Sequence, residues 1–311
     1  MAEARWREGE LASPTGATLH TWEIAPQGTP ASLVQINHGM AEHGARYERF
    51  ARFLAGRGHA VIAHDHRGHG ATTAPDAPLG MFGSGDGWAS VIADTAAVNA
   101  HLRAMHPDTP LVVFGHSMGA TVALDFALTH PAAVDGVALF NISASAPVLL
   151  RVFSVLLGIE RMFKGSDTPS GLATAMTFSA WNRRFRPNRT EFDWLSRDEA
   201  EVDKYVADPL CGFPVSVGLW RALVAAILST GDDRRLAALP RNLPFCLVGG
   251  GEDPVSDRGR EIVALSRRLE RAGFSDVTAK VYEATRHETL NEINRDIAMA
   301  SFADWLDARY A

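Results

Sequence analysis

The 311-residue chain predicts an α/β fold in which helices cover both faces of a largely parallel sheet. Short apolar runs alternate with amphipathic stretches over residues 1–142 and again over residues 240–311, and this alternation favours a parallel sheet. Between these two parts, residues 143–239 carry no strand pattern and are too long for an ordinary loop. We therefore expect one α/β core, interrupted by a helical insertion at residues 143–239 that lies over the active-site edge as a lid.

In the first part of the core, short apolar runs predict strands at residues 18–24, 32–37, 60–63, 111–114 and 137–140. Proline and glycine at residues 26–30 separate the first two strands. Helical spacing of apolar residues predicts helices at residues 46–57, 88–105 and 117–129. The last two helices stop before Pro107 and Pro131, because proline cannot continue a helix.

The insertion contains two apolar stretches with helical periodicity, residues 148–163 and 215–228, and a polar, aromatic stretch at residues 183–197. After the insertion the core pattern returns. It predicts strands at residues 245–248 and 277–282, and helices at residues 261–271 and 293–307.

Composition excludes several classes of protein. Charged residues make up 21% of the chain and the net charge is -6, with no basic stripe, so we expect no nucleic-acid partner. Residues 1–8 are charged and carry no apolar core, so we expect no secretory signal, and no apolar run is long enough to span a bilayer. Two cysteines fit a reducing compartment. The expected location is cytoplasmic or peripheral at a membrane, and nothing in the sequence specifies an oligomeric state.

The most specific motif is the G-x-S-x-G run at residues 115–119, which follows the apolar run 111–114 and opens the predicted helix 117–129. In this context the serine lies on a sharp strand-to-helix turn, where only glycine leaves enough room. Its hydroxyl then stands above the sheet at the positive end of a helix. A nucleophile needs this position and a structural serine does not, so we expect Ser117 to be a nucleophile.

Two further candidates follow later strands in the chain order that a hydrolase triad has on such a sheet. Asp253 comes after the strand 245–248, and His287 comes after the strand 277–282. His287 can remove the serine proton and later protonate the leaving group, while Asp253 would orient the imidazole. The alternatives are a capping or turn role for Asp253, with Glu252 as a rival acid, and a surface position for His287.

A tetrahedral intermediate on Ser117 also needs donors for its oxyanion. The backbone N–H of Met118, directly after the nucleophile, is the first candidate. The second should come from the loop after an earlier strand, and Met40 follows the strand 32–37 in that position.

A polar run at residues 64–70 contains three histidines and an aspartate. It lacks the i,i+4 pairing and the fourth ligand that a metal site requires. We expect instead a strand-end loop whose polar groups hydrogen-bond one another beneath the site, and we expect no metal.

The apolar cluster at residues 148–157 of the insertion has two possible interpretations. It can be a lid helix packed on the core, or it can form an acyl-chain tunnel or a surface that touches lipid. One amphipathic helix is compatible with both.

Several blocks occur in a specific order: His38-Gly39-Met40-Ala41-Glu42-His43 followed by Arg46-Tyr47, then residues 65–70, the serine motif, Asp208-Pro209-Leu210, and Arg286-His287-Glu288 followed by residues 290–292. Together they resemble the monoacylglycerol lipase / lysophospholipase branch of the α/β-hydrolase superfamily. The resemblance covers most of the chain outside the insertion. Within the insertion, which sets substrate choice, residues 208–210 are the landmark.

The resemblance implies an α/β-hydrolase fold, with an eight-stranded, mostly parallel sheet and a helical cap after the sixth strand. It implies the triad of Ser117, Asp253 and His287, with Met40 and Met118 as oxyanion donors and no cofactor. It also implies that Glu42 lies near the alcohol side of the site, where it would bind a glycerol hydroxyl with Arg46 as its charge partner.

The expected function is a serine carboxylester hydrolase that cleaves small acyl esters or single-chain lipids through an acyl-enzyme. An aminopeptidase is an alternative, but it needs an acidic pocket, for which Glu42 is one candidate. Thioesterase and acyltransferase activities use the same triad. A ligand receptor without turnover could also be built on this fold. A halide-cleaving enzyme is disfavoured because its elbow would carry Asp in place of Ser117.

Overall fold

The computed structural model describes residues 5–83, 87–143 and 147–311. Residues 1–4, part of the charged start in which no secretory signal is expected, lie outside these ranges, as do residues 144–146 of the predicted insertion. None of the helices in the described part of the chain combines the length and the hydropathy needed to cross a membrane.

The strands form one eight-stranded sheet in the order β1-β2-β4-β3-β5-β6-β7-β8. β1 pairs with β2 and β2 with β4 in antiparallel register, and the other neighbouring pairs are parallel. The expectation of an eight-stranded, mostly parallel sheet is therefore confirmed. The bounds are β1 Arg7–Ala12, β2 Thr18–Ile24, β3 Leu33–Asn37, β4 Ala60–His64, β5 Leu111–His116, β6 Gly136–Phe140, β7 Phe245–Gly250 and β8 Val277–Tyr282.

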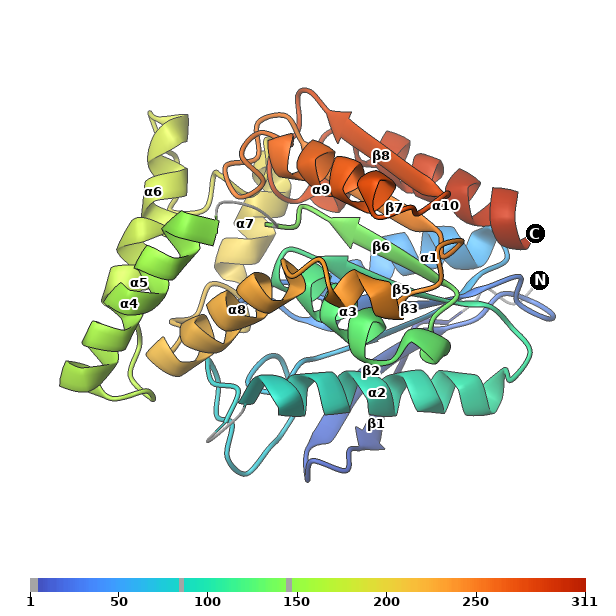
Figure 1. Cartoon of the computed structure of the whole chain (residues 1–311), viewed down its shortest axis with the longest axis horizontal. Coiled ribbons are helices and arrows are strands. Elements are labelled where there is room, and N and C mark those ends of the chain that lie inside the picture. Colours follow the sequence, from blue (N-terminus) through green and yellow to red (C-terminus); the bar gives the residue numbers. More distant parts are fainter. Residues whose placement is uncertain (1–4, 84–86, 144–146) are drawn as a thin grey trace.

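Helices cover both faces of the sheet (Figure 1). α1 (Glu48–Gly56) and α10 (Arg295–Tyr310) share one apolar cluster with one face. α2 (Gly87–Met105), α3 (Met118–Thr129) and α9 (Arg260–Arg271) share a second cluster with the other face. The central strands β3, β4, β5, β6 and β7 are buried along their whole length, which explains their continuous apolar runs.

The predicted strands and helices of the core agree with the structure to within a few residues. The helix expected at residues 46–57 is divided into a 3-10 turn, η1 (Gly44–Tyr47), and α1. Strand β1 was not predicted, because this edge strand is mostly exposed and carries charged residues between small ones. Short 3-10 turns also lie in the connections, namely η2 (Pro131–Ala133), η4 (Arg235–Ala238) and η5 (Thr289–Asn291).

Between β6 and β7 the described chain forms a set of helices that we call the helical insertion. Figure 1 shows α4, α5 and α6 beyond the sheet, on the side away from the two termini. The stretches expected at residues 148–163 and 215–228 are found in α4 and α8, whereas the shorter helices between them were not predicted. The bounds are α4 Pro147–Lys164, α5 Gly171–Met176, α6 Phe178–Asn182, η3 Arg183–Phe185, α7 Glu199–Ala207 and α8 Val217–Thr230.

Candidate active site

Ser117 lies on a sharp turn between β5 and α3, as the motif predicts. Its backbone adopts φ 55° and ψ −117°, a region that non-glycine residues rarely occupy. The strain is opposed by close packing around it. Ser117 N–H donates to the Phe140 carbonyl at 2.9 Å, and the Ser117 carbonyl accepts from Ala120 N–H at 3.0 Å.

Both glycines of the motif are needed because backbone atoms lie where a side chain would begin. A Cβ on Gly115 would lie 2.1 Å from the carbonyl oxygen of Gly119, and a Cβ on Gly119 would lie 2.1 Å from the carbonyl oxygen of Asn37. These contacts are far inside van der Waals range, and neither partner is a flexible side chain. The turn therefore packs directly against the end of β3, from which the loop with Met40 starts.

We predict that Gly119→Ala lowers both stability and ester turnover, since the added methyl must displace the end of β3. The expected loss of unfolding free energy is about 1–3 kcal/mol. Gly158→Ala is the matched control, because Gly158 lies inside α4 and a Cβ there meets nothing within 4 Å. This control should be neutral or slightly stabilising. Urea denaturation and ester assays of both variants check the prediction, and equal behaviour of the two would contradict it.

His287 and Asp253 are paired and buried. His287 Nδ1 lies 2.9 Å from Asp253 Oδ1, and the two side chains are 2% and 0% exposed. Burial by itself raises the pKa of Asp253, but the charge and hydrogen bond of His287 outweigh it and leave the pKa below its usual value. Asp253 is therefore an ionised partner for one nitrogen of the imidazole, which leaves the other nitrogen for chemistry in the pocket.

Further residues that the sequence did not single out fix this carboxylate. Asn141 Nδ2 and Ser256 Oγ donate to Asp253 Oδ2 at 3.1 and 2.7 Å, and Val255 N–H donates to Oδ1 at 2.9 Å. Asn141 follows the last residue of β6, so its place at the carboxyl end of a parallel strand could have indicated it. Glu252, the rival acid, is more exposed and lies 3.9 Å from the guanidinium of Arg286.

Ser117 and His287 line one pocket, together with Met40 and Met118. The pocket encloses about 930 Å3 of empty space, including its mouth. Within the described ranges, neither Met40 N–H nor Met118 N–H donates a hydrogen bond to another residue. Two unoccupied backbone donors beside a turn serine are what an oxyanion hole requires.

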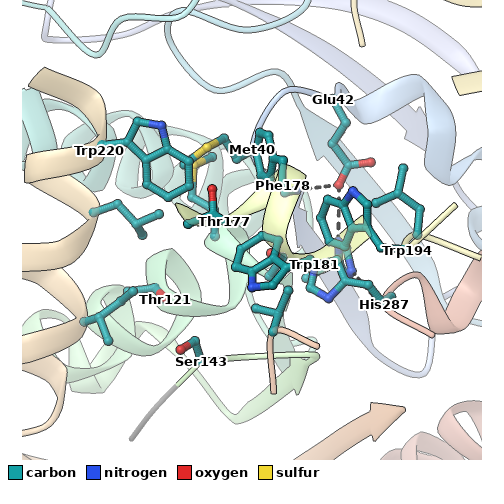
Figure 2. Close-up of a pocket in the computed structure, with 18 of the residues that line it drawn as sticks. Met40, Glu42, Thr121, Ser143, Thr177, Phe178, Trp181, Trp194, Trp220 and His287 are labelled. Atoms are coloured by element: carbon teal, nitrogen blue, oxygen red, sulfur yellow. Dashed lines mark hydrogen bonds and ion pairs between the residues drawn. The ribbon is translucent and has the colours of Figure 1, made fainter. Parts of the chain in front are cut away.

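The two sides of this pocket differ in chemistry (Figure 2). Glu42, Trp194 and His287 lie on one side, Trp220, Thr121 and Ser143 lie on the other, and Trp181 lies between them. Apolar side chains of the insertion also line the pocket, namely Leu150, Phe153, Leu223, Val224 and Ile227, and the Phe153 ring packs against Trp220. The charged side chain of Glu42 thus lies on the side of His287, and the Phe153–Trp220 pair lies on the other.

Glu42 is buried, and each of its carboxylate oxygens already has a partner. Oε1 accepts from Gly39 N–H at 2.5 Å and from the Tyr47 hydroxyl at 3.0 Å, and Oε2 accepts from Arg46. Burial by itself would raise the pKa of Glu42, but the charge of Arg46 and the contact with His116 keep it well below its usual value.

Arg46 is the charge partner of Glu42, as expected, and it also joins Glu42 to the loop after β8, residues 283–288, which we call the histidine loop. The sequence did not predict this second contact. The Arg46 guanidinium binds both oxygens of Glu288 at 2.7 Å, and Glu288 directly follows His287. Arg46 itself does not line the pocket, whereas Glu42 and Glu288 do. The two carboxylates are therefore held at the polar side by one buried cation.

A segment of the insertion, residues 193–198, is hydrogen-bonded to the histidine loop. Glu288 N–H donates to the Leu195 carbonyl at 2.7 Å, and Arg286 donates to the Asp193 carbonyl at 2.6 Å. The Trp194 ring lies 5.0 Å from the His287 ring. The insertion thus supplies part of the wall against which the imidazole rests.

The polar run at residues 64–70 is buried beside the loop after β3, residues 38–43, which we call the oxyanion loop, and it only partly matches its prediction. Its rings lie close to His38, which accepts from His66 N–H at 2.9 Å. The expected mutual bonding is found for His69, whose Nδ1 lies 3.1 Å from the Arg67 carbonyl oxygen. It is wrong for His64 and His66, whose ring nitrogens have no hydrogen-bond partner within the described ranges. They pack as neutral rings.

A possible metal-ligand set lies elsewhere among the described residues. His43, Asp208 and Cys211 each offer a ligand atom within 4.8 Å of the others. His43 Nε2 and Asp208 Oδ2 are hydrogen-bonded to each other at 2.8 Å, and burial raises the pKa of the Cys211 thiol. These groups are therefore held as neighbours by the fold, away from Ser117.

An eight-stranded sheet of this order, with a serine elbow after β5, defines an α/β-hydrolase. The family model described as serine aminopeptidase, S33 (Hydrolase_4) matches residues 28–294. The chain belongs to this family.

Within this family, the chain is similar to several lipases and esterases. The human monoglyceride lipase is 29% identical over 97% of this chain and 90% of its own length. A carboxyl esterase from Bacillus coagulans, solved in complex with glycerol, superimposes with a TM-score of 0.88 at 26% identity, covering 98% of this chain and 99% of its own. A lipase in its open form superimposes with a TM-score of 0.83 at 30% identity, with the same coverage. The chain is thus a monoglyceride lipase-like α/β-hydrolase.

Proposed function

We propose that the protein is a serine carboxylester hydrolase that acts on single-chain acyl esters, with Ser117, Asp253 and His287 as its catalytic triad. The observation that carries the proposal is that Ser117 and His287, which is paired with Asp253, line one pocket together with apolar side chains of the insertion. The lipase and carboxyl esterase relatives support ester substrates.

The reaction follows from these positions. The Ser117 oxygen attacks the ester carbonyl while His287 takes its proton, and the Met40 and Met118 N–H groups stabilise the oxyanion. His287 then gives the proton to the alcohol oxygen as the C–O bond breaks, which leaves an acyl-Ser117 enzyme. Water then attacks this ester while His287 takes its proton, and His287 returns that proton to the Ser117 oxygen as the acyl C–O bond breaks and the acid is released. Loss of one oxyanion donor would cost about 3 kcal/mol of transition-state stabilisation.

The residues that line the two sides of the pocket indicate how an ester substrate would be oriented in it. The acyl chain would lie on the apolar side among the side chains of α4 and α8, and the alcohol would leave past His287. On that side Glu42 Oε2 has Arg46 as its protein donor, so it keeps acceptor capacity for a glycerol hydroxyl. Glu42 would then bind the alcohol, with Arg46 holding the carboxylate in place.

The same region argues against aminopeptidase activity as the main function. A substrate ammonium group needs uncompensated negative charge, and Glu288 does place a second acid beside Glu42. However, Arg46 is hydrogen-bonded to both carboxylates, so it offsets part of their negative charge and occupies oxygen atoms on each. Thioesters and acyl transfer use the same triad, and a substrate panel must separate them from simple esters.

We further propose that the insertion, residues 143–239, acts as a cap whose outer face touches lipid surfaces transiently. One face of α4 is directed inward, since Phe153 lines the pocket and Leu157 is buried. The opposite face is apolar but exposed. It consists of Val148, Leu149, Val152, Val155, Ile159, Met162 and Phe163. An apolar stripe of this kind on the outside of a cap is typical of a surface that meets aggregated substrate.

We predict that the double variant Leu149→Glu/Val152→Glu loses several-fold activity on dispersed long-chain monoacylglycerol. Two exposed apolar side chains that would be buried against the lipid surface become charged in this variant. Soluble short-chain esters, which need no surface contact, should be hydrolysed at the wild-type rate. Ile297→Glu, which charges an exposed apolar residue of α10, is the control and should leave both rates unchanged. An equal loss on both substrates would indicate misfolding and contradict the prediction.

The proposal is tested by a panel of p-nitrophenyl esters, monoacylglycerols, lysophospholipids, acyl thioesters and aminoacyl amides, assayed with the wild type and Ser117→Ala. We expect turnover of esters that depends on Ser117. A single product molecule per protein followed by no further release would favour the receptor alternative. Turnover of amides above esters would favour the aminopeptidase.

A further inference from the structure

His116, the variable residue of the serine motif, lies between two other parts of the active site. It ends β5 directly before Ser117, and its side chain is 9% exposed. Its Nε2 lies 3.1 Å from the backbone carbonyl oxygen of His287. Its Nδ1 lies 3.3 Å from Glu42 Oε1.

Both of these partners are acceptors. A backbone carbonyl cannot donate, and Glu42 Oε1 already accepts from Gly39 N–H and the Tyr47 hydroxyl. Each ring nitrogen of His116 must therefore carry a proton for both contacts to be hydrogen bonds. This geometry requires an imidazolium. The contact and charge of Glu42 outweigh the effect of burial and raise the pKa of His116, which agrees with that assignment.

The other groups that face this ring come from several elements. Glu42 is the nearest carboxylate, and Glu288 adds a second negative charge from the histidine loop. Arg46 binds both of these carboxylates, and the His287 ring lies 4.8 Å from the His116 ring. Two carboxylates and two cations, Arg46 and the His116 imidazolium, thus balance in charge.

Through Glu42, the bridge reaches the oxyanion loop. The carboxylate that accepts from His116 also holds Gly39 N–H at 2.5 Å, one residue before Met40. It meets Arg46 as well, which holds Glu288, the residue after His287. The serine turn, the oxyanion loop and the histidine loop therefore share one buried hydrogen-bonded network.

We propose that His116 is a positioning residue, an imidazolium that holds the histidine loop and, through Glu42, the oxyanion loop against the serine turn. It touches no reacting atom. It keeps the His287 imidazole and the Met40 N–H at fixed positions relative to the Ser117 oxygen. We therefore expect it to stabilise the transition state more than it strengthens substrate binding. The kinetic part rests on the proposed ester hydrolysis.

The kinetic experiment compares His116→Gln with His59→Gln. His59 is an equally internal histidine, with partners Ser32 and Asp307 at 2.9 and 3.0 Å, outside the pocket. On a soluble p-nitrophenyl ester we expect His116→Gln to lower kcat roughly 10- to 100-fold while KM changes little. Affinity for a boronic acid, which mimics the tetrahedral intermediate, should fall in parallel with kcat/KM. His59→Gln should affect thermal stability only.

The second experiment needs no activity. Nitrogen NMR of 15N-histidine-labelled wild type should show protons on both ring nitrogens of His116 at pH 7.5, assigned by their loss in His116→Gln. A neutral His116 ring, or a folded His116→Gln variant with wild-type kcat, would overturn the proposal. If the wild type hydrolysed no ester, the proposed function would fail, and the NMR result would still decide whether the charged bridge exists.

Discussion

Ser117→Ala is expected to lower kcat on a soluble ester by roughly 10⁶-fold, while the protein stays folded and still binds substrate. Ser117 supplies the one oxygen that attacks, and no neighbouring hydroxyl on the turn can replace it. Asp253→Asn should keep the geometry but lose roughly 10⁴-fold, because the imidazole would be held in the wrong tautomer. Initial-rate kinetics on purified variants measure both losses.

The control for this series is Ser301→Ala, which removes a hydroxyl from α10, far along the chain from the serine turn. Its kinetics should equal those of the wild type. A Ser117→Ala variant that kept more than a few per cent of the wild-type rate would mean that another group is the nucleophile. Melting curves of each variant exclude unfolding as the cause.

The second large effect concerns acid stability. His38, His64, His66 and His69 are all fully or almost fully buried near the oxyanion loop. Burial lowers the pKa of His38 to about 3 and of His64 and His69 to about 4, and burial also keeps that of His66 well below its usual value. At neutral pH all four are uncharged, whether the chain is folded or unfolded.

The direction of the pH effect follows from proton binding. Below about pH 6.5 the unfolded chain binds protons on these four side chains and the folded chain does not, so the free energy of unfolding falls as the pH falls. Each histidine lowers the free energy of unfolding by up to about 1.4 kcal/mol for every pH unit between about pH 6.5 and its pKa in the folded protein. Against a total stability of about 5–15 kcal/mol, we expect the fold to be lost near about pH 5.

Urea denaturation at pH 7.5 and pH 5.5 measures this effect. The wild type should lose several kcal/mol between the two values. His66→Phe is the informative variant, because neither ring nitrogen of His66 has a partner among the described residues. It should change stability little at pH 7.5 and reduce the acid loss by about one histidine's share. His130→Gln, at an exposed position, is the control. A stability that stayed constant down to pH 5 would contradict the account.

Much of the core could be predicted from sequence, because its central strands are buried on both faces and appear as unbroken apolar runs. β5 and α3 show this well, since the strand, the glycines and the helix pattern together predicted the turn at Ser117. The positions of Asp253 and His287 after two neighbouring strands predicted that they lie close together, because parallel strands bring their carboxyl ends to one edge, and the structure pairs the two side chains.

Other features could not be predicted because their causes are not local. β1 is mostly exposed, so no apolar pattern indicated it. The short helices α5, α6 and α7 are set by packing on the rest of the molecule more than by their own sequence. The contacts of Arg46 with Glu288, and of His116 with the His287 carbonyl, join residues far apart in the chain. Spacing along the sequence carries no record of such contacts.

The most direct test of the central claim is covalent labelling with a fluorophosphonate, which reacts with an activated serine. Labelled protein is digested, and the modified peptide is identified by mass spectrometry. We predict one probe per chain, on Ser117, and greatly slowed labelling in His287→Gln. An unlabelled wild-type protein, or a probe found on another residue, would contradict the account.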